Sequence, residues 1–334
     1  MATIVDVARL AGVSTSTVSH VVNETRVVAD ATRERVLAAV AQVNYRQDGV
    51  ARAMRRSKTD SIGVVVSDAS QPMFAEMVHG VEQGATPAGL TVLLANSTED
   101  PRQEAKILDV LEARRVDGIV VAPVAHSLAS HLDAIRDRGI PIVLMDRLGL
   151  LDIDQVGVVN TDPTAELVRH LAGHGHRRIG LVVGDLAVAT MSERRLGYDQ
   201  GLRAAGLSPD EDLVVVSTGS AEQTCTSVKE LLSSPARPTA LVAASTTTAA
   251  GALLAAQELN LRCPQDLAFA TFDGFAYPDL FHPRITTVTQ PAREVGTAAF
   301  RLLQARMNGH RSDPFEVIRL EPAIDYRDSC GCHS

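Results

Sequence analysis

From residue 61 onward, short apolar runs alternate with longer amphipathic segments, and this alternation limits the possible folds more than any other feature of the sequence. Segments such as 74–88 and 103–114 have helical spacing and stand between the apolar runs. The runs lie at residues 62–66, 91–95, 118–122, 140–145, 179–183, 213–216, 239–244 and 267–271. Strand and helix repeated in this order predict parallel sheets that are covered by helices on both faces.

The number of strand–helix units is larger than one compact sheet can hold. The pattern therefore predicts two doubly wound lobes that divide near residue 160. We expect a further helix over 292–307 to return to the first lobe. Ligands of such folds bind beyond the carboxyl ends of the strands, so the predicted pocket is a cleft between the lobes.

Residues 4–22 have a different pattern, which predicts two short helices joined by a tight turn. Apolar residues spaced i, i+4, i+7 from Ile4 form one face of the first helix, and Gly12 is placed to end it. Ser14 is a good N-cap for a second helix that runs to about Val22. A helix, a glycine-containing turn and a second helix is the helix-turn-helix geometry, in which the second helix enters the major groove of DNA.

The polar side chains of the second helix make this interpretation more specific, while Val18, Val21 and Val22 are placed to pack inward. The residues that we expect to contact DNA are Thr15, Ser16 and His20 at base edges and Thr17, Ser19, Asn23 and Tyr45 at phosphates. The alternative is that these serines and threonines only cap and solubilise a small helical bundle.

A third helix is predicted after Asp30, its expected N-cap, with Val36, Val40 and Val43 on one face. Residues 47–60 are basic and have too few apolar side chains for a core. Because helices of under about 12 residues are marginal in water, we expect this segment alone to be mostly unfolded.

The charge distribution separates the N-terminal module from the body. The whole chain carries a net charge of −8, but residues 1–60 hold nine Lys and Arg against six Asp and Glu, a balance of +3. The remaining residues hold 23 basic and 34 acidic side chains, a balance of −11. A basic end on an acidic body suits a module that contacts phosphates and a body that does not.

Several enzyme classes are disfavoured by missing motifs. The sequence has 29 Arg and 3 Lys and no Gly-Lys-Ser or Gly-Lys-Thr, which excludes a P-loop. It has no Gly-x-Ser-x-Gly, no His-Glu-x-x-His and no Gly-x-Gly-x-x-Gly that opens a helix. We therefore expect neither an enzyme nor a cofactor. The N-terminus lacks a secretion signal and no apolar run approaches about 20 residues, which predicts a cytoplasmic protein without a membrane span.

Metal binding is also not expected from the sequence. The cysteines, Cys225, Cys263, Cys330 and Cys332, lack a second ligand pair at zinc-site spacing and are interpreted as free thiols. His170, His174 and His176 have metal-like spacing, but they lie where a helix ends at glycine and a strand begins. Histidines in that position more often cap helix carbonyls, so the prediction is that there is no metal site.

Two stretches, IVDVARLAGVSTSTVSHVVN and VADATRERVLAAVAQVNYRQDGVARAMRR, resemble the lactose-repressor and galactose-repressor (LacI/GalR) family, and the first is closest to its purine-repressor branch. The resemblance continues in order through SIGVVV, RVDGIVV, HGHRRIGLV, SERRLGY, FDGFAYPDLFHPRITTVTQP and EVGTAAFRLL. It implies a homodimeric, sequence-specific transcriptional regulator, expected to be a repressor, that binds a palindromic operator in double-stranded DNA and responds to a small-molecule effector.

The fold implied by the resemblance is a small all-α helix-turn-helix domain followed by an α/β body of two doubly wound parallel-sheet lobes, like that of periplasmic binding proteins. The expected boundaries are a DNA-binding domain at 1–46, a hinge at 47–60 and an effector-binding and dimerisation domain at 61–334. Lobe 1 is expected at about 61–159 plus 291–322, and lobe 2 at about 160–290 plus the C-terminal tail.

In this family residues 48–56 correspond to a hinge helix that folds on operator DNA. Met54 stands where the family has a leucine that wedges between base steps in the minor groove. By the same resemblance Arg52 and Arg55 neutralise phosphates, and Arg26 adds a further contact.

The effector pocket that the resemblance implies contains Phe74, Arg147, Asp162, Arg194, Ser245 and Asp273. Arginine donates in a fixed fork and aspartate accepts, so together they suit hydroxyl-rich or carboxylate-bearing ligands. The chain departs from the family at Ser245-Thr246 and Val159-Asn160, and both departures remove carboxylates. A sugar or sugar derivative is the expected effector. A nucleobase or nucleoside, a ligand-binding protein without a DNA role and an enzyme on the same scaffold are the alternatives.

Overall fold

The computed structural model describes residues 2–23, 26–45, 58–127, 129–149, 152–275, 277, 280–310 and 314–332. The chain divides into two compact units, Met1–Thr59 and Asp60–Ser334. Arg52, Met54 and Arg55, expected in the hinge, lie outside the described residues.

The first unit is a bundle of α1 (Ile4–Ala11), α2 (Thr15–Val22) and α3 (Asp30–Gln42). Gly12 ends α1 in the left-handed conformation at φ 65°, and the Ser14 hydroxyl caps α2 by accepting the amide of Thr17, both as predicted. Its core is formed by Val7, Ala8, Ala11, Val18, Val21, Val36 and Ala39.

The start of α3 differs from the prediction. Asp30 is the first residue of the helix and not its N-cap; Ala29 holds the cap position without a side-chain hydrogen bond. A carboxylate in the first turn of a helix is attracted by the positive end of the helix dipole. Asp30 therefore still stabilises α3 electrostatically.

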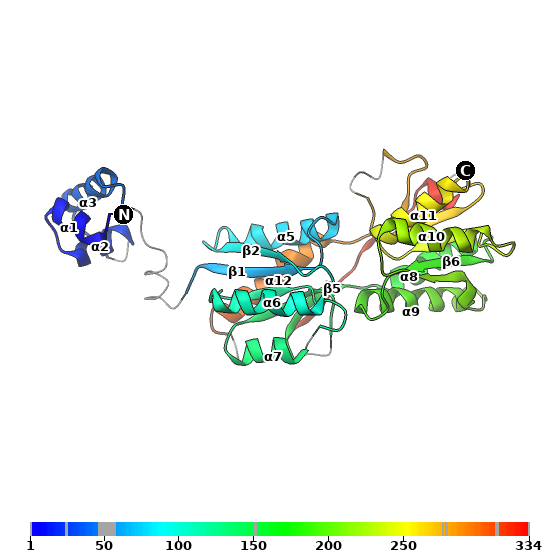
Figure 1. Cartoon of the computed structure of the whole chain (residues 1–334), viewed down its shortest axis with the longest axis horizontal. Coiled ribbons are helices and arrows are strands. Elements are labelled where there is room, and N and C mark those ends of the chain that lie inside the picture. The colour runs from blue at the N-terminus through cyan, green and yellow to red at the C-terminus, as the bar shows by residue number, and fades with distance from the viewer. Residues whose placement is uncertain are drawn as a thin grey trace. The chain divides into compact units, whose positions relative to one another are not determined.

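The first lobe of the second unit is a parallel sheet in the order β11-β5-β4-β3-β1-β2. Its strands are β1 (Ser61–Val66), β2 (Thr91–Asn96), β3 (Ile119–Val121), β4 (Ile142–Asp146), β5 (Asp154–Val158) and β11 (Val317–Leu320). The helices of this lobe are α5 (Pro72–Ala85), α6 (Pro101–Ala113), α7 (Ala129–Asp137) and α12 (Ala292–Met307). Figure 1 shows α5 on one side of this sheet and α6 and α7 on the other.

The second lobe repeats the design with the strand order β12-β10-β9-β8-β6-β7. Its strands are β6 (Ile179–Val183), β7 (Val214–Val216), β8 (Ala240–Ala243), β9 (Ala268–Phe272), β10 (Thr286–Thr289) and β12 (Ala323–Asp325). Its helices are α8 (Thr161–Gly173), α9 (Ala189–Ala204), α10 (Ala221–Ser233) and α11 (Thr246–Glu258), with short 3-10 turns η1 (Glu211–Leu213) and η3 (Asp328–Cys330). The edge strand β12 runs antiparallel to β10, whereas the other described pairs are parallel.

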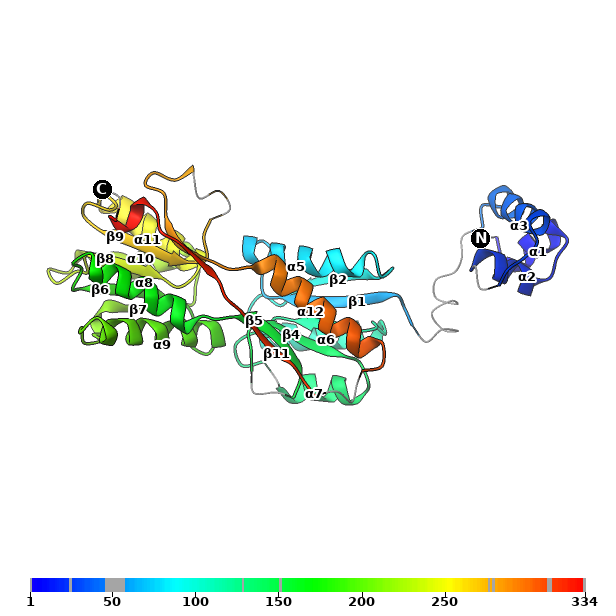
Figure 2. The same ribbon diagram turned by 180° about the vertical axis from the view of Figure 1, so that it is seen from behind.

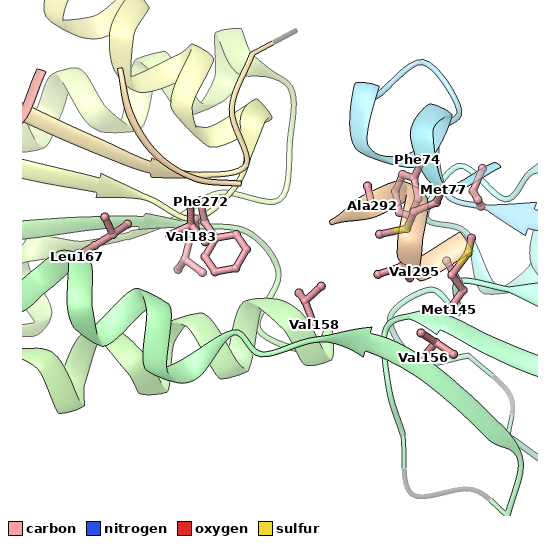
Figure 3. Close-up of a cluster of buried hydrophobic side chains, with 14 of the residues drawn as sticks. Phe74, Met77, Met145, Val156, Val158, Leu167, Val183, Phe272, Ala292 and Val295 are labelled. Atoms are coloured by element: carbon pink, nitrogen blue, oxygen red, sulfur yellow. The ribbon is translucent and has the colours of Figure 1, made fainter. Parts of the chain in front are cut away.

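The chain passes between the lobes after β5, returns after β10 and passes over again between β11 and β12, as Figure 2 shows. Buried apolar side chains line both sides of these crossings: Figure 3 shows Phe74, Met145 and Val295 in the first lobe and Val183 and Phe272 in the second. The carboxyl ends of the strands of both lobes therefore face the region where the chain crosses.

The returning helix α12 packs along α5, and glycine allows the two backbones to meet. A Cβ on Gly80 would stand 2.1 Å from the carbonyl oxygen of Arg293, and a Cβ on Gly296 would stand 1.9 Å from that of Met77. Any larger side chain at either position would force these helices apart.

The strands that the apolar runs did not indicate are β5, β10, β11 and β12. The buried polar side chains in β5 and β10 explain two of these omissions. In β5, the Asp154 carboxylate accepts from the Arg306 guanidinium at 2.6 and 2.8 Å. In β10, Thr286 is buried and its amide donates to the Ser329 hydroxyl. Among the described residues, no helix is long and apolar enough to cross a membrane.

Candidate functional site

The N-terminal end of α2 presents a group of hydroxyls. Ser14, Thr15 and Ser16 are exposed. The Ser14 Oγ lies 2.7 Å from the Ser16 Oγ and 2.8 Å from the Thr17 Oγ1. Amide groups at a helix N-terminus attract anions, and short hydroxyls donate and accept, so this end of α2 can contact both phosphates and base edges.

The other DNA-contact candidates of the first unit lie in two settings. Asn23 donates through its amide to the Ser19 carbonyl at 2.7 Å and to the Ser19 Oγ at 3.1 Å, which fixes both side chains at the end of α2. His20 and Tyr45 are half-buried and Arg26 is exposed. Tyr45 packs against the apolar core of the bundle.

In the first lobe, Arg147 follows β4, and its guanidinium is surrounded by hydrogen-bond acceptors. Its Nη1 and Nη2 donate to the Glu99 carboxylate at 2.9 and 2.6 Å, and Nη1 also donates to the Pro123 carbonyl. Burial alone would raise the pKa of Glu99, but the hydrogen bond and charge of Arg147 outweigh it and the pKa is lowered. Arg147 is therefore a cation at the carboxyl edge of the sheet that is fixed by its hydrogen bonds, and Glu99 is ionised beside it.

Two more carboxyl groups lie at this edge, and both are buried. Burial raises the pKa of Asp146 to about 6 against the opposing charges of Arg147 and Arg194. Its Oδ1 has no hydrogen-bond partner in the described part of the chain. Burial also raises the pKa of Glu104, which accepts from the Val124 amide and the Ser127 hydroxyl. The edge thus holds more acceptors than donors.

In the second lobe, Arg194 of α9 is 2% exposed and joins three elements. Its Nη1 donates to the Asp273 carboxylate at 3.1 Å and to the Ala244 carbonyl at 2.6 Å, and its Nε donates to Asn160 at 2.9 Å. The guanidinium carbon lies 3.6 Å from the centroid of the Phe272 ring. These contacts hold the guanidinium rigidly, and its Nη2 has no partner among the described residues.

Asp273 follows β9 and is the acceptor of this network. Its backbone is left-handed at φ 61°, a conformation that costs a non-glycine residue energy and is tolerated best by Asn and Asp. Gln290 donates to its second oxygen. A strained backbone at a strand end, held by Arg194 and Gln290, is typical of a binding site.

The other three expected pocket residues differ in exposure and in what they contact. Phe74 is 1% exposed in the apolar core. Its ring centroid lies 5.9 Å from the Arg147 guanidinium carbon, so the ring packs against Arg147 from the core side. The Ser245 hydroxyl caps α11 by accepting the Thr248 amide. Asp162 is exposed in the first turn of α8.

Two cavities are lined by residues of both lobes. One of about 350 Å³ joins Pro123, His126 and Arg147 to residues 187–189. The other, of about 280 Å³, joins Met73 and Glu76 of α5 to Asp273 and Gln290. Arg147 lines the first of these cavities and Asp273 lines the second, while Arg194 lines neither of the two.

Sequence reasoning missed Glu99, Glu104, Asp146, Asn160 and Gln290 as members of these networks. Asp146 carried a signal, because it lies directly after the predicted strand 140–145 at the edge where ligands bind. The interpretation of the histidines as helix caps holds for His174, which is the C-cap of α8 and whose backbone amide donates to helix carbonyls, while the side chains of the other two make different contacts. His176 contacts the Thr239 hydroxyl at 2.9 Å, and His170 contacts Cys330.

Comparison with known proteins places both units. Residues 3–48 match the family model described as bacterial regulatory proteins, lacI family, and residues 59–321 match the model described as periplasmic binding proteins and sugar binding domain of LacI family. The chain is 35% identical to the HTH-type transcriptional repressor PurR of Pectobacterium carotovorum, over 98% of this chain and 97% of that protein. It is 34% identical to the PurR of Klebsiella pneumoniae over the same shares.

Solved structures agree with these matches. A lac repressor dimer bound to operator and the anti-inducer ONPF is similar with a TM-score of 0.87 at 26% identity, over 98% of this chain and 99% of that chain. A complex of the transcriptional regulator CelR with cellobiose is similar with a TM-score of 0.73 at 28% identity, over 98% and 100%.

Proposed function

This chain belongs to the LacI family of bacterial regulatory proteins, and from that premise we propose that its effector is a neutral, hydroxyl-rich molecule, a sugar or sugar derivative, bound between the lobes at Arg147, Arg194 and Asp273. The chain is a DNA-binding transcriptional regulator under small-molecule control and not an enzyme, because the family consists of such regulators. The identity of the ligand and the roles of single residues belong to the proposal.

The charge balance of the cleft carries the proposal. Arg147 is already paired with Glu99 and Arg194 with Asp273, while the buried Asp146 and Glu104 add further acceptors. An anionic ligand would have to displace these carboxylates or lie beside them in a low-dielectric site, at a high electrostatic cost. A neutral ligand with many hydroxyls can donate to the carboxylates and accept from the guanidinium groups without adding charge.

The scarcity of accessible aromatic rings favours a sugar over a flat base. Phe74 is buried behind Arg147, and the Phe272 face is covered by Arg194. Phe275 lines the smaller cavity, and His126 is the ring on the larger one. A nucleobase gains much of its binding energy from stacking on aromatic faces, and this cleft offers little such surface. The cellobiose complex of the related CelR agrees with a carbohydrate ligand.

On the DNA side, we propose that the N-terminal end of α2 enters the major groove, with Thr15 and Ser16 at base edges. The similar lac repressor is a dimer on its operator. A dimer of this chain, working in the cytoplasm, would bind a near-palindromic site whose half-sites lie about one helical turn apart. The basic balance of residues 1–60 supplies the phosphate attraction that such binding needs.

The link between the two sites is proposed to be a change in how the lobes close. Glu193 of α9 accepts from Arg319 of β11 and from Asn160, which in turn accepts from Arg194. This chain of contacts connects the proposed ligand site to the strands that cross between lobes. A ligand that alters it shifts the lobe arrangement, and such coupling is typically about 1 to 3 kcal/mol and reciprocal.

A panel of sugars and nucleobases tests the proposal. The shift in unfolding temperature of the full chain is measured for each compound, and every compound that stabilises the protein is then added to an operator-binding titration. We expect neutral sugars to raise the unfolding temperature and to change operator affinity, in a direction that shows whether the effector releases or promotes DNA binding. Stabilisation by nucleobases alone would contradict the assigned ligand class.

A further inference from the structure

We propose that the chain has a metal site, separate from the effector cleft, in which His170, Cys330 and Cys332 bind a thiol-preferring cation such as Zn²⁺. His170 lies in the last turn of α8, while Cys330 ends η3 near the C-terminus. The His170 Nε2 lies 3.2 Å from the Cys330 Sγ, and the two cysteine Sγ atoms lie 2.8 Å apart. These ligand atoms all lie within 4.8 Å of one another.

The spacing fits a first coordination shell. With metal–sulfur bonds of about 2.3 Å and metal–nitrogen bonds of about 2.0 to 2.1 Å, tetrahedral ligand atoms stand roughly 3.5 to 3.8 Å apart. The two separations of 3.2 and 2.8 Å are shorter than this value and the third is at most 4.8 Å, so side-chain rotations that move the sulfur atoms apart would admit the ion. Two thiolates and an imidazole favour Zn²⁺ or another soft cation over Mg²⁺ or Ca²⁺, which prefer oxygen ligands.

The ligands are held in place by contacts that do not involve the cation. The His170 ring stacks on Tyr326 with a centroid distance of 4.2 Å, and Tyr326 donates to Glu166 on the same helix as His170. Ser329, next to Cys330, donates to the Phe269 carbonyl at 2.7 Å and accepts the Thr286 amide at 2.8 Å. Both α8 and the tail are therefore anchored to the lobe before a cation binds, which lowers the cost of ordering the site.

If Cys330 and Cys332 were only free thiols, nothing would require the His170 nitrogen to lie beside them. Both sulfurs lie against the Arg327 carbonyl, and the Cys330 side chain is fully buried. Three protein ligands leave the fourth position of a tetrahedral ion for water or an outside ligand. Binding would fasten the C-terminal tail to α8, the helix that begins beside Asn160 in the second lobe.

Titration of the reduced, metal-free full chain with Co²⁺ and Zn²⁺ tests the site. Co²⁺ is expected to bind with one ion per chain and to give the sulfur-to-metal charge-transfer absorption of thiolate ligands, which Zn²⁺ then displaces. Cys332→Ser and His170→Gln are expected to weaken Zn²⁺ binding by at least about tenfold in competition with a chromophoric chelator, the low end of the loss expected when a site's supporting contacts are broken. Cys225→Ala is the matched control, because that cysteine is buried on α10 and belongs to another cluster.

A second readout does not depend on spectroscopy. Zn²⁺ should raise the unfolding temperature of the wild-type chain and of Cys225→Ala, but not of Cys332→Ser or His170→Gln, because a ligand that binds only the folded state stabilises it. Circular dichroism of each variant shows whether it is folded. The site is disproved if Co²⁺ binds without a thiolate band, or if both ligand variants bind Zn²⁺ as tightly as the wild type.

Discussion

Arg194 and Asp273 come from different elements, 79 residues apart in sequence, and meet in a buried ion pair with 3.1 Å between Nη1 and Oδ2. Asn160 accepts a hydrogen bond from the Arg194 Nε, and the Ala244 carbonyl accepts one from the Arg194 Nη1. A buried ion pair of this kind orients both groups, and it is weak evidence for a contribution to stability.

Replacing Arg194 tests this relationship. Arg194→Ala is expected to abolish the effector response and to leave operator binding without effector intact, because the first unit is a separate compact body. Calorimetric titration with the stabilising sugar should show no binding. The variant should also lose about 3 to 5 kcal/mol of stability, since Asp273 is left buried without its cation.

The neighbouring arginine provides the control for that variant. Arg195 lies on the same helix but pairs with Asp199 and Glu211 and not with Asp273. Arg195→Ala should keep the effector response. A fully responsive Arg194→Ala protein would remove Arg194 from the ligand site.

Asp146 predicts a pH dependence of stability. Its pKa is about 6 in the folded chain, and we take the ordinary value of 3.8 for the unfolded chain, so the folded state holds the proton more tightly between these values. The free energy of unfolding should therefore fall as pH rises from about 4 to about 6, by at most about 3 kcal/mol from this group. Chemical denaturation at a series of pH values measures the slope.

Asp146→Asn should remove that part of the slope, and asparagine tolerates the left-handed backbone, φ 68°, at this position. If a ligand hydroxyl donates to the ionised carboxylate, effector affinity should also drop below about pH 6 in the wild type alone. Equal pH profiles for the two proteins would show that Asp146 is ionised throughout.

Ser16 is the sharpest test of the DNA interface. Ser16→Ala leaves the Ser14 cap bonded to Thr17, so the stability of α2 should change little. Loss of one neutral hydrogen bond should weaken operator binding by about threefold to tenfold at fixed salt, with unchanged binding to scrambled duplex. Gln42→Ala, exposed on α3, is the matched variant that should bind both duplexes normally.

The contact of α5 with α12 predicts a steric effect. Gly296→Ala should destabilise the second unit by about 1 to 3 kcal/mol, because its methyl group would overlap the Met77 carbonyl oxygen. Gly173→Ala, with open space around the added Cβ, should be neutral or stabilising. Thermal unfolding followed by circular dichroism compares them, and equal midpoints would mean that the helices can separate without cost.

Local sequence rules predicted the elements whose residues agree with their surroundings. The capped helix after Ser14, the glycine stop at Gly12 and the apolar strands β1, β6 and β8 all follow from propensity and pattern. The family resemblance supplied Arg194 and Asp273 as pocket residues, and the structure adds that they form an ion pair with each other. The family and the two-lobed fold were therefore accessible from the sequence and are confirmed by the comparisons.

Features that depend on distant contacts were not accessible in this way. The polar strand β5 is stabilised by Arg306, which lies more than 150 residues away in sequence, and His170 meets Cys330 across 160 residues. Glu99 and Glu104 resemble ordinary surface acids until the fold gathers them around Arg147, and the sequence marks Asp146 only by its place directly after a predicted strand. Alternating apolar patterns report burial along one element, and they contain no information on which charged groups share an edge.

The most direct measurement is the operator affinity of the full chain with and without the stabilising sugar. The operator is first selected from a pool of random duplexes by the immobilised protein, and affinity is then followed by fluorescence anisotropy at fixed salt. We predict a near-palindromic site and an affinity that the sugar changes by about 5- to 150-fold in the wild type and not in Arg194→Ala. A sugar that binds the cleft tightly and leaves operator affinity unchanged would contradict effector control through this site.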